Sequence, residues 1–277
     1  MKEKIQILKF PAVSKTALVT LYCKALDYQA KNSILKDKFS YDLYNRIEFD
    51  WDLIKKGLRI TDPILMGIRV RKFDQMCLQF LERHPNGIIV SLGSGLDYRF
   101  GRINNNQYYF VDIDFPEVLE FKKLITPIST RNLLIGKSVL DYSWIEQVLK
   151  FSTENHAPVF FIAEGLMIYL EMREIQELLK GIHEAFPQAE VFFDMFNERA
   201  KKTAERKSMF KDWDVEIKTA LNSGKRMEEW GIGFKVLSEW YFSDDQDAKR
   251  GWMKLIWVIP GVKKWQYFIH GKFEKYK

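Results

Sequence analysis

The sequence predicts a doubly wound α/β fold with a mostly parallel sheet. Between residues 87 and 197, short apolar runs alternate with amphipathic segments, a glycine turn at residues 93–95 directly follows the first apolar run, and two aspartates close the second. Strands that alternate with helices along a chain form parallel sheets covered by helices on both faces. Ligands bind such sheets at the carboxyl ends of the strands, where the turn and the aspartates are expected.

Length and composition limit the classes of protein to consider. The 277 residues are 47% apolar and 15% aromatic, enough to bury one large core, and a net charge of +6 is too small to indicate a nucleic-acid partner. Cys23 and Cys77 are the only cysteines, which excludes a disulfide framework and favours a reducing compartment. The chain has no signal-peptide-like start, no apolar run that could cross a bilayer and no metal-ligand spacing among its four histidines. We therefore expect a cytoplasmic protein with neither a metal nor a membrane partner.

The first region, residues 14–82, is expected to be helical. Ser14 and Thr16 are helix-start residues, and the proline at position 63 opens a second helical run. The next region supplies the sheet, because its apolar runs are short and rich in β-branched and aromatic residues. The expected strands are residues 88–92, 108–111, 132–135, 159–163 and 189–193.

Amphipathic segments connect and follow these strands. One helix begins at Pro116, and another carries apolar residues at helical spacing over residues 175–186. Residues 198–250 are charged and helix-prone, with three glycines as breaks. The last two strand candidates are residues 254–259 and 266–269.

The glycine turn indicates what kind of ligand fits. Gly93 and Gly95 tolerate positive φ and let ligand atoms approach the backbone. A pyrophosphate-binding turn has a third glycine three residues later, and Tyr98 stands there instead. The bulky ring disfavours a pyrophosphate but leaves room for a phosphate-free ligand such as S-adenosylmethionine (SAM). An ordinary tight turn between strand and helix is the alternative.

An acidic pair closes the second strand. Asp112 and Asp114 follow Gly95 by seventeen and nineteen residues, and a carboxylate at about this distance accepts hydrogen bonds from ribose hydroxyls. Asp114 also stands three residues before Glu117, the spacing of a capping box for the next helix. From the residues alone, both roles of Asp114 stay open.

Glu164 interrupts an apolar strand end. A carboxylate at the carboxyl end of a central parallel strand faces the ligand crevice, and leaving it there unpaired is costly. It should therefore meet a cation, a hydroxyl or an amine of a ligand. An ion pair with an Arg or Lys of the helical region is the alternative.

Four motifs, in this order, resemble those of the leucine carboxyl methyltransferase family, which includes bacterial polyketide O-methyltransferases. The similarity extends from residue 14 to about residue 196 and becomes loose beyond it. The motifs are TDP and IRVRKFD at residues 61–63 and 68–74, VSLGSGLDYRF at 90–100, FVDIDFPEVLEFK at 110–122 and AEGLMIYL at 163–170.

The resemblance implies a SAM site. Arg69, assisted by Lys15, would hold the methionine carboxylate, for which a guanidinium has suitable paired donors. Gly93 and Gly95 would line the methionine moiety. Glu164 would contact the amino group of the cofactor or lie near its sulfonium.

The sugar and the base of the cofactor would lie farther along the sheet. The motif places Asp114, rather than Asp112, on the family aspartate that binds ribose, although both are candidates. Many members contact adenine through an acidic residue and its neighbour, and alignment on Trp144 puts Ser138 and Val139 at those positions. Adenine recognition through a hydroxyl or the backbone is expected instead.

With the resemblance, the predicted fold becomes a seven-stranded Rossmann-like methyltransferase sheet. We expect a helical cap at residues 1–85, a SAM-binding core at 86–197, an inserted helical lid at 198–250 and carboxyl-terminal strands at 251–277 that complete the sheet. Tyr98 and Tyr169 would wall the acceptor site.

The expected activity is SAM-dependent transfer of a methyl group to a carboxylate or hydroxyl of a small molecule, such as a polyketide or another secondary metabolite. The candidate catalytic side chains are Tyr169 and Glu164, and a carboxylate acceptor would need no base because it is already ionised. Methylation of a protein carboxyl terminus is the second reading, and a non-catalytic SAM sensor or scaffold is the third. The sequence does not predict the oligomeric state.

Overall fold

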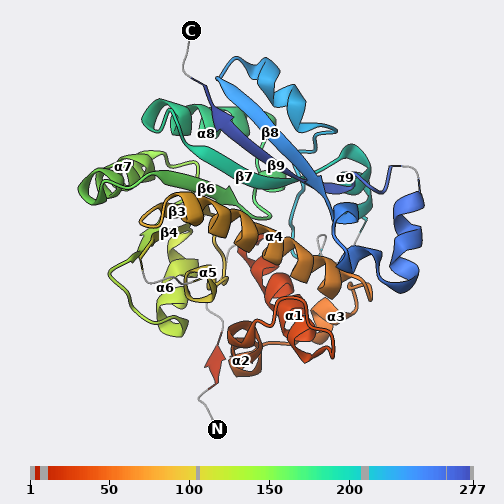
Figure 1. Ribbon diagram of the computed structural model, residues 1–277. Coiled ribbons are helices and arrows are strands. Elements are labelled where there is room, and N and C mark those ends of the chain that lie inside the picture. Colours follow the sequence, from red (N-terminus) through yellow and green to blue (C-terminus); the bar gives the residue numbers. More distant parts are fainter. Residues whose placement is uncertain (1–3, 7–11, 104–106, 207–211, 260, 275–277) are drawn as a thin grey trace.

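A seven-stranded sheet with helices on both faces forms the centre of the molecule (Figure 1). The computed structural model describes residues 4–6, 12–103, 107–206, 212–259 and 261–274. The strand order is β5-β4-β3-β6-β7-β9-β8; the first five strands are parallel, and β9 and β8 are antiparallel to their neighbours. The predicted doubly wound, mostly parallel sheet is confirmed. The strands are β3 (Ile88–Leu92), β4 (Tyr109–Asp114), β5 (Asn132–Gly136), β6 (Val159–Ala163), β7 (Glu190–Phe196), β8 (Phe234–Tyr241) and β9 (Gln266–Phe273).

Helices account for most of the remaining elements. The α-helices are α1 (Thr16–Gln29), α2 (Lys38–Arg46), α3 (Asp52–Lys55), α4 (Asp62–Arg83), α5 (Arg99–Arg102), α6 (Pro116–Ile125), α7 (Ser143–Asn155), α8 (Met172–Ala185) and α9 (Glu198–Ala204). The 3-10 helices are η1 (Val13–Lys15), η2 (Met167–Tyr169), η3 (Gly224–Trp230), η4 (Phe242–Asp244), η5 (Asp247–Lys249) and η6 (Gly251–Val258). A small parallel pair, β1 (Ile5–Gln6) and β2 (Ile47–Glu48), lies outside the main sheet.

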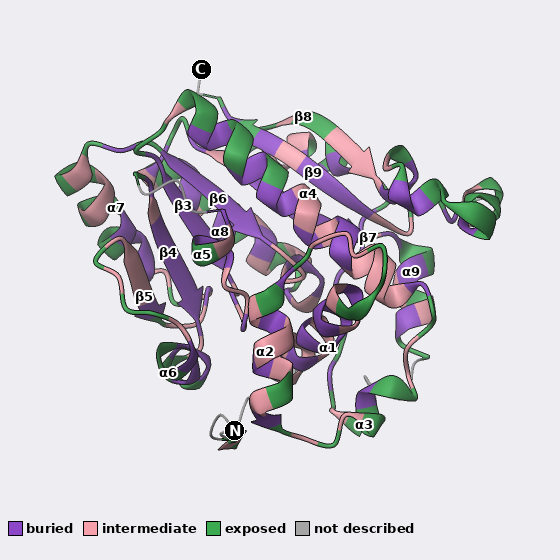
Figure 2. Ribbon diagram, turned by 60° about the horizontal axis from the view of Figure 1, so that its bottom comes forward, coloured by how far each residue is buried: buried purple, intermediate pink, exposed green. Residues whose placement is uncertain are grey.

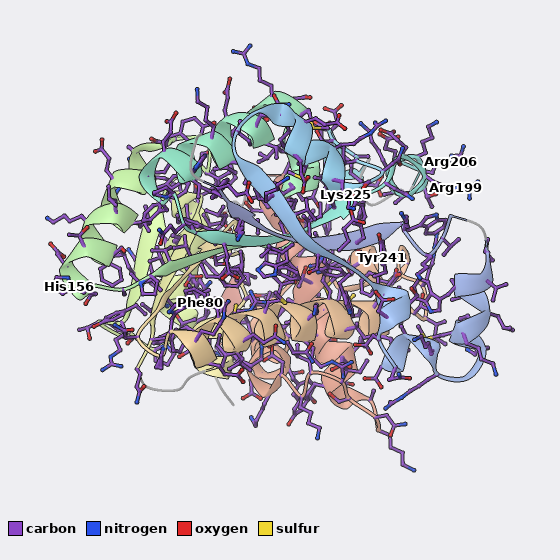
Figure 3. All side chains as sticks on the ribbon, turned by 45° about the horizontal axis from the view of Figure 1, so that its top comes forward. Phe80, His156, Arg199, Arg206, Lys225 and Tyr241 are labelled. Carbon is purple, nitrogen blue, oxygen red and sulfur yellow. The ribbon has the colours of Figure 1, made fainter. Side chains whose placement is uncertain are left out.

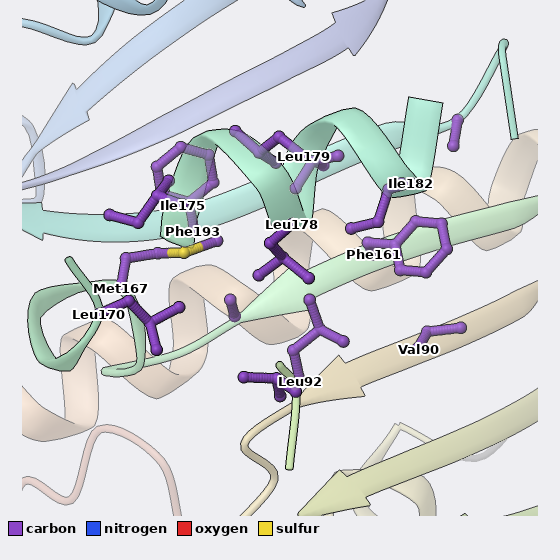
Figure 4. Close-up of a cluster of buried hydrophobic side chains, with 14 of the residues drawn as sticks. Val90, Leu92, Phe161, Met167, Leu170, Ile175, Leu178, Leu179, Ile182 and Phe193 are labelled. Atoms are coloured by element: carbon purple, nitrogen blue, oxygen red, sulfur yellow. The ribbon is translucent and has the colours of Figure 1, made fainter. Parts of the chain in front are cut away.

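The two faces of the sheet are covered by different helices. Side chains alternate between the faces of a strand, so Val90 and Leu92 belong to the cluster packed under α8, whereas Ile89 belongs to the cluster under α4. Figure 4 shows Leu178 and Ile182 of α8 directed toward the β3 and β6 side chains. Each fully buried side chain of this size contributes roughly 1.5–3 kcal/mol. This burial fixes the sheet, and thereby the positions of its strand ends.

The carboxyl end of β3 is the point where the chain connections diverge. β3 pairs with β4 on one side and with β6 on the other, so the connections after these strands leave in opposite directions and open a crevice between them. Helices α1 and α4 pack against each other over this end of the sheet (Figure 2). The helical first region therefore covers the crevice.

The segment 198–250 differs from the predicted helical lid. It begins with α9 and contains η3, but residues 234–241 form β8, an edge strand of the main sheet. The alternation of β8 is interrupted by a register shift between Val236 and Ser238, and its outer face is exposed. The segment reads as helix-prone because of the charged residues on either side of β8, and the register shift interrupts the alternation by which a strand is recognised.

The predicted strand at residues 254–259 is also wrong, whereas the predicted strand beginning at Gln266 is confirmed as β9. Residues 251–258 form η6 instead. The run packs on the body of the protein through Trp257, whose ring stacks on Phe242, and joins no edge of the sheet. It coils into a 3-10 helix, which has three residues per turn.

Candidate functional site

A cavity of about 470 Å³ lies at the carboxyl ends of β3, β4 and β6, beneath α1 and α4. Its size is within the range of small-molecule sites. Within the described part of the chain, Lys15, Tyr98 and Asp112 are the predicted site residues that do not line it. The predicted residues that do line it are Arg69, Gly93, Gly95, Asp114, Ser138, Val139, Glu164 and Tyr169.

Three glycines shape the floor of the cavity. Gly93, Gly95 and Gly165 have φ angles of +64°, +52° and +65°, which side chains other than glycine adopt only with strain. A Cβ at Gly165 would lie 3.3 Å from a terminal nitrogen of Arg69, and one at Gly95 would lie 3.3 Å from the Cβ of Ala17. The missing side chains let the backbone and Arg69 approach any ligand closely.

Asp114 joins the end of β4 to the glycine turn. Its Oδ2 accepts a hydrogen bond from the Gly95 N–H at 2.7 Å, and its Oδ1 accepts one from the Phe115 N–H at 2.7 Å. Burial raises the pKa of Asp114 although both N–H groups oppose the shift. Phe115, not Asp114, is the N-cap of α6 and makes no side-chain cap, so the capping-box alternative is wrong. The carboxylate lines the cavity, where ribose hydroxyls could reach it.

Asp112 has a different environment, although it lies on the same face of β4. Its Oδ1 is 2.6 Å from the Nζ of Lys122 on α6, and the two side chains are 2% and 1% exposed. Lys122 also donates a hydrogen bond to the Ser94 Oγ at 3.2 Å. The structure therefore places Asp112 in a buried ion pair behind the glycine turn, away from the cavity that the sequence suggested for it.

Arg69 and Glu164 meet in the cavity. The Nε of Arg69 is 3.0 Å from one oxygen of Glu164, and Arg99 reaches the other oxygen at 2.6 Å. Burial lowers the pKa of Arg69, but Glu164 and Asp194 outweigh this effect and raise it. The ion pair that the sequence offered as the alternative for Glu164 is thus present. The terminal nitrogens of Arg69 lie beside Gly165, on the ligand side.

The sequence prediction missed the charges behind this pair. Arg99 Nε is 2.7 Å from Asp74, and Arg102 is bonded to Asp74 and, at 2.9 Å, to Asp97. Burial opposes ionisation of Asp97, but Arg102, Lys24 and Arg99 hold its pKa well below the usual value. This network fixes the orientation of Arg99, one of the two arginines that hold Glu164.

Asp194 is a further missed residue, and its signal was present in the sequence. Asp194 interrupts the apolar strand β7, just as Glu164 directly follows the apolar strand β6. A carboxylate in such a place is costly to leave unpaired, so both residues should meet a partner or a ligand. Its Oδ1 accepts a hydrogen bond from the Gly165 N–H at 2.6 Å, and its Oδ2 lies 3.9 Å from Arg69. Burial raises the pKa of Asp194, with Arg69 and the Gly165 N–H opposing. Asp194 therefore supports both the third glycine and Arg69.

One end of the cavity is formed by the segment after β5. Ser138 and Val139 line it, together with Lys137 and Leu140. The Oγ of Ser138 accepts a hydrogen bond from the Leu140 N–H at 3.2 Å, and the carbonyl of Val139 accepts one from the Trp144 Nε1 at 3.0 Å. Trp144 is fully buried, so it anchors this segment against the sheet.

Apolar side chains contribute to the rest of the lining. Among them are Leu58, Leu65, Met66, Phe196 and Phe242.

Tyr169 belongs to the lining as well, and burial raises the pKa of its phenol, with a hydrogen bond to Thr16 opposing the shift. Its hydroxyl is therefore a proton donor at neutral pH and a poor base. Tyr98 does not line the described cavity; its ring packs against Phe39, with centroids 4.9 Å apart. Lys15 lies in η1, between the lining residues Ser14 and Thr16.

Two properties of the described residues bear on metal binding and on membrane crossing. No group of three or more His, Cys, Asp or Glu side chains is arranged there to hold a metal ion. None of the described helices combines the length and the apolar character that a membrane crossing needs.

Comparison with known proteins identifies the family. A profile of the leucine carboxyl methyltransferase family matches residues 17–183, more than half of the chain. The protein belongs to the leucine carboxyl methyltransferase family. It is therefore an enzyme of the methyltransferase class, as its sequence motifs predicted.

Individual relatives extend the match along the chain. The tetracenomycin polyketide synthesis O-methyltransferase of Streptomyces glaucescens is 25% identical over 259 residues, which cover 93% of each chain. A SAM-dependent methyltransferase of Gibberella zeae is 28% identical over 184 residues, 62% of this chain and 61% of that one. The crystal structure of a DUF574 family protein from Streptomyces avermitilis superimposes with a TM-score of 0.63 at 12% identity, over 91% of this chain and 97% of that one. The last match shows the shared fold alone.

Proposed function

We propose that the protein is a SAM-dependent O-methyltransferase whose acceptor is a small molecule with an apolar body. The observation that carries the proposal is a single cavity that combines the glycine turn and Asp114 at one place, Arg69 with Glu164 at another, and an apolar wall beyond them. Relatives that cover most or much of the chain are named as a polyketide O-methyltransferase and a SAM-dependent methyltransferase, which supports the same reading.

The cavity fits SAM in its donor set. Asp114 would accept hydrogen bonds from the ribose, the segment 138–139 would border adenine, and the terminal nitrogens of Arg69 would hold the carboxylate of the methionine moiety. The glycines at positive φ leave the cradle open where a Cβ would intrude. When bound, the cofactor supplies a methyl group on a positively charged sulfur.

The residues of this chain position the acceptor and exclude water from it. Transfer requires the acceptor oxygen in line with the methyl group, and holding that geometry is worth several kcal/mol of the barrier. The apolar wall around Phe196 and Phe242 would hold the body of the acceptor in a dry environment.

The two predicted catalytic side chains, Tyr169 and Glu164, are poorly suited to remove a proton. No histidine lines the described cavity, and His156 lies at the far end of the molecule (Figure 3). Tyr169 keeps its proton, and Glu164 is held by two arginines. A carboxylate acceptor needs no base because it is ionised at neutral pH, so the states of Tyr169 and Glu164 favour a carboxylate over a hydroxyl.

The test uses labelled SAM and the purified protein. Incubation with a small-molecule extract should transfer label into extractable compounds; label in macromolecules alone would indicate a protein acceptor, and binding without turnover would indicate a SAM sensor. Arg69→Ala should weaken S-adenosylhomocysteine binding by about tenfold or more, since a charged hydrogen bond is worth about 1.5–3 kcal/mol. The control is Arg173→Ala, which removes an arginine that is 86% exposed on α8. Full affinity in Arg69→Ala would overturn the assigned site.

A further inference from the structure

The 3-10 helix η6 carries an exposed apolar stripe. Trp252, Leu255 and Val258 recur every third residue, and a 3-10 helix has three residues per turn, so they lie on one side of it. They are 57%, 62% and 76% exposed, and the adjacent Ile259 is 54% exposed. Figures 1 and 2 show this segment projecting from the body of the molecule beyond the ends of β8 and β9. Four large apolar side chains gathered on a projection indicate an interaction site rather than ordinary surface.

Positive charge predominates in the sequence that contains this stripe. Residues 248–273 contain no Asp or Glu. Lys263 and Lys264 lie over the ring of Tyr241, which Figure 3 labels at the end of β8, at 5.6 and 5.7 Å from its centroid. The exposed cations between residues 248 and 265 are Lys249, Arg250, Lys254, Lys263 and Lys264, of which Arg250 forms an ion pair of 2.6 Å with Asp247.

The segment is held firmly against the rest of the protein. The Trp257 Nε1 donates a hydrogen bond to the Ala248 carbonyl at 2.7 Å, and the Trp257 ring stacks on Phe242 with centroids 6.4 Å apart. Just before η6, Arg71 of α4 forms ion pairs with Asp245 at 2.8 Å and Asp247 at 2.6 Å. The stripe is therefore preorganised, and Phe242 connects its base to the wall of the cavity.

We propose that this segment docks the protein on the surface of an anionic lipid membrane. Tryptophan and aliphatic side chains that enter the region between headgroups and acyl chains, flanked by lysines that meet the headgroups, are the combination that such binding uses. A second copy of the chain fits less well, because a two-fold contact would bring the two cationic rims together. The docking departs from the sequence-based expectation of no membrane partner and does not depend on the acceptor. The basic apolar surface is Trp252, Leu255, Val258 and Ile259 with Lys249, Lys254, Lys263 and Lys264.

The experiment is co-sedimentation of the full chain with lipid vesicles. We expect binding to vesicles of equal parts phosphatidylcholine and phosphatidylglycerol, with much weaker binding to phosphatidylcholine alone and a loss of binding at high salt. Lys249→Gln with Lys254→Gln should reduce the partition coefficient about 25-fold, at about fivefold per cation. Leu255→Ser with Val258→Ser should reduce it at least tenfold.

A matched control separates this surface from general exposure of apolar groups. Leu124→Ser with Ile128→Ser changes two side chains that are 67% and 97% exposed elsewhere, and should leave vesicle binding unchanged. Circular dichroism and sedimentation velocity of each variant report folding and self-association. The proposal is overturned by absent binding to anionic vesicles, by equal binding to neutral ones, or by binding that the surface variants leave intact. It is also overturned if the surface instead forms a dimer that Leu255→Ser with Val258→Ser dissociates.

Discussion

Replacing Lys122 with methionine tests whether Asp112 is a structural group. The two side chains form an ion pair of 2.6 Å and are 1% and 2% exposed, and methionine retains the apolar stem of lysine without its charge. The carboxylate of Asp112 would then remain buried without a counter-charge. Removing one partner of a buried pair costs about 3–5 kcal/mol of the free energy of unfolding. In a chain of this size, such a loss lowers the Tm by on the order of 10 °C.

The assay is urea and thermal unfolding followed by circular dichroism. The double variant Asp112→Asn with Lys122→Met should regain most of the loss, because no charge is left unpaired in the interior. A loss below about 1 kcal/mol in Lys122→Met would contradict this account. So would a double variant no more stable than the single one, because the cost would then come from packing around residue 122.

Three further predictions address the site, the pH dependence and a buried thiol. Asp114→Asn should weaken S-adenosylhomocysteine binding about 10- to 100-fold in calorimetry, through loss of charge-assisted hydrogen bonds to the ribose; unchanged affinity would remove Asp114 from the site. Burial raises the pKa of Glu190, but hydrogen bonds from His270 and Arg83 outweigh it and lower the pKa to about 2, so its stabilisation is present above its normal value of 4.5 and disappears as the pH falls toward 2. Because Arg83 is half exposed and screened, Glu190→Gln should flatten the acid limb of the stability curve by only about 1–2 kcal/mol, and an unaltered limb would refute the assignment. Burial raises the pKa of Cys77 to about 12, so in a Cys23→Ser variant no thiol should react with Ellman's reagent at pH 8 until the protein unfolds.

The strands buried on both faces could be predicted from sequence. The run at residues 159–163 is apolar throughout because no side of β6 meets water, and its predicted bounds match those of the strand. β8 could not be recognised in the same way, because it is only partly buried and its register shift breaks the alternation. Residues 254–259 have an apolar pattern typical of a strand, but they form a 3-10 helix that packs through Trp257 on Phe242, a contact that no local pattern encodes.

The candidate site, too, could be predicted only in part. The sequence placed Asp112 and Asp114 together, and the two do share one face of β4. What separates their roles is Lys122, which reaches back from α6 to one of them and not to the other. Partners far apart in the chain, such as Lys24 with Asp97, depend on how α1 crosses the sheet, which no local pattern encodes.

Helix α4 serves two places at once. Arg69 reaches into the cavity, while two residues later Arg71 forms ion pairs with Asp245 and Asp247 in the turn that leads to η6. A helix resists bending over so short a distance. The contact of Arg69 with Glu164 and the contacts of Arg71 with Asp245 and Asp247 are therefore kept at a fixed spacing. A displacement of η6 would therefore also displace the backbone beside Arg69.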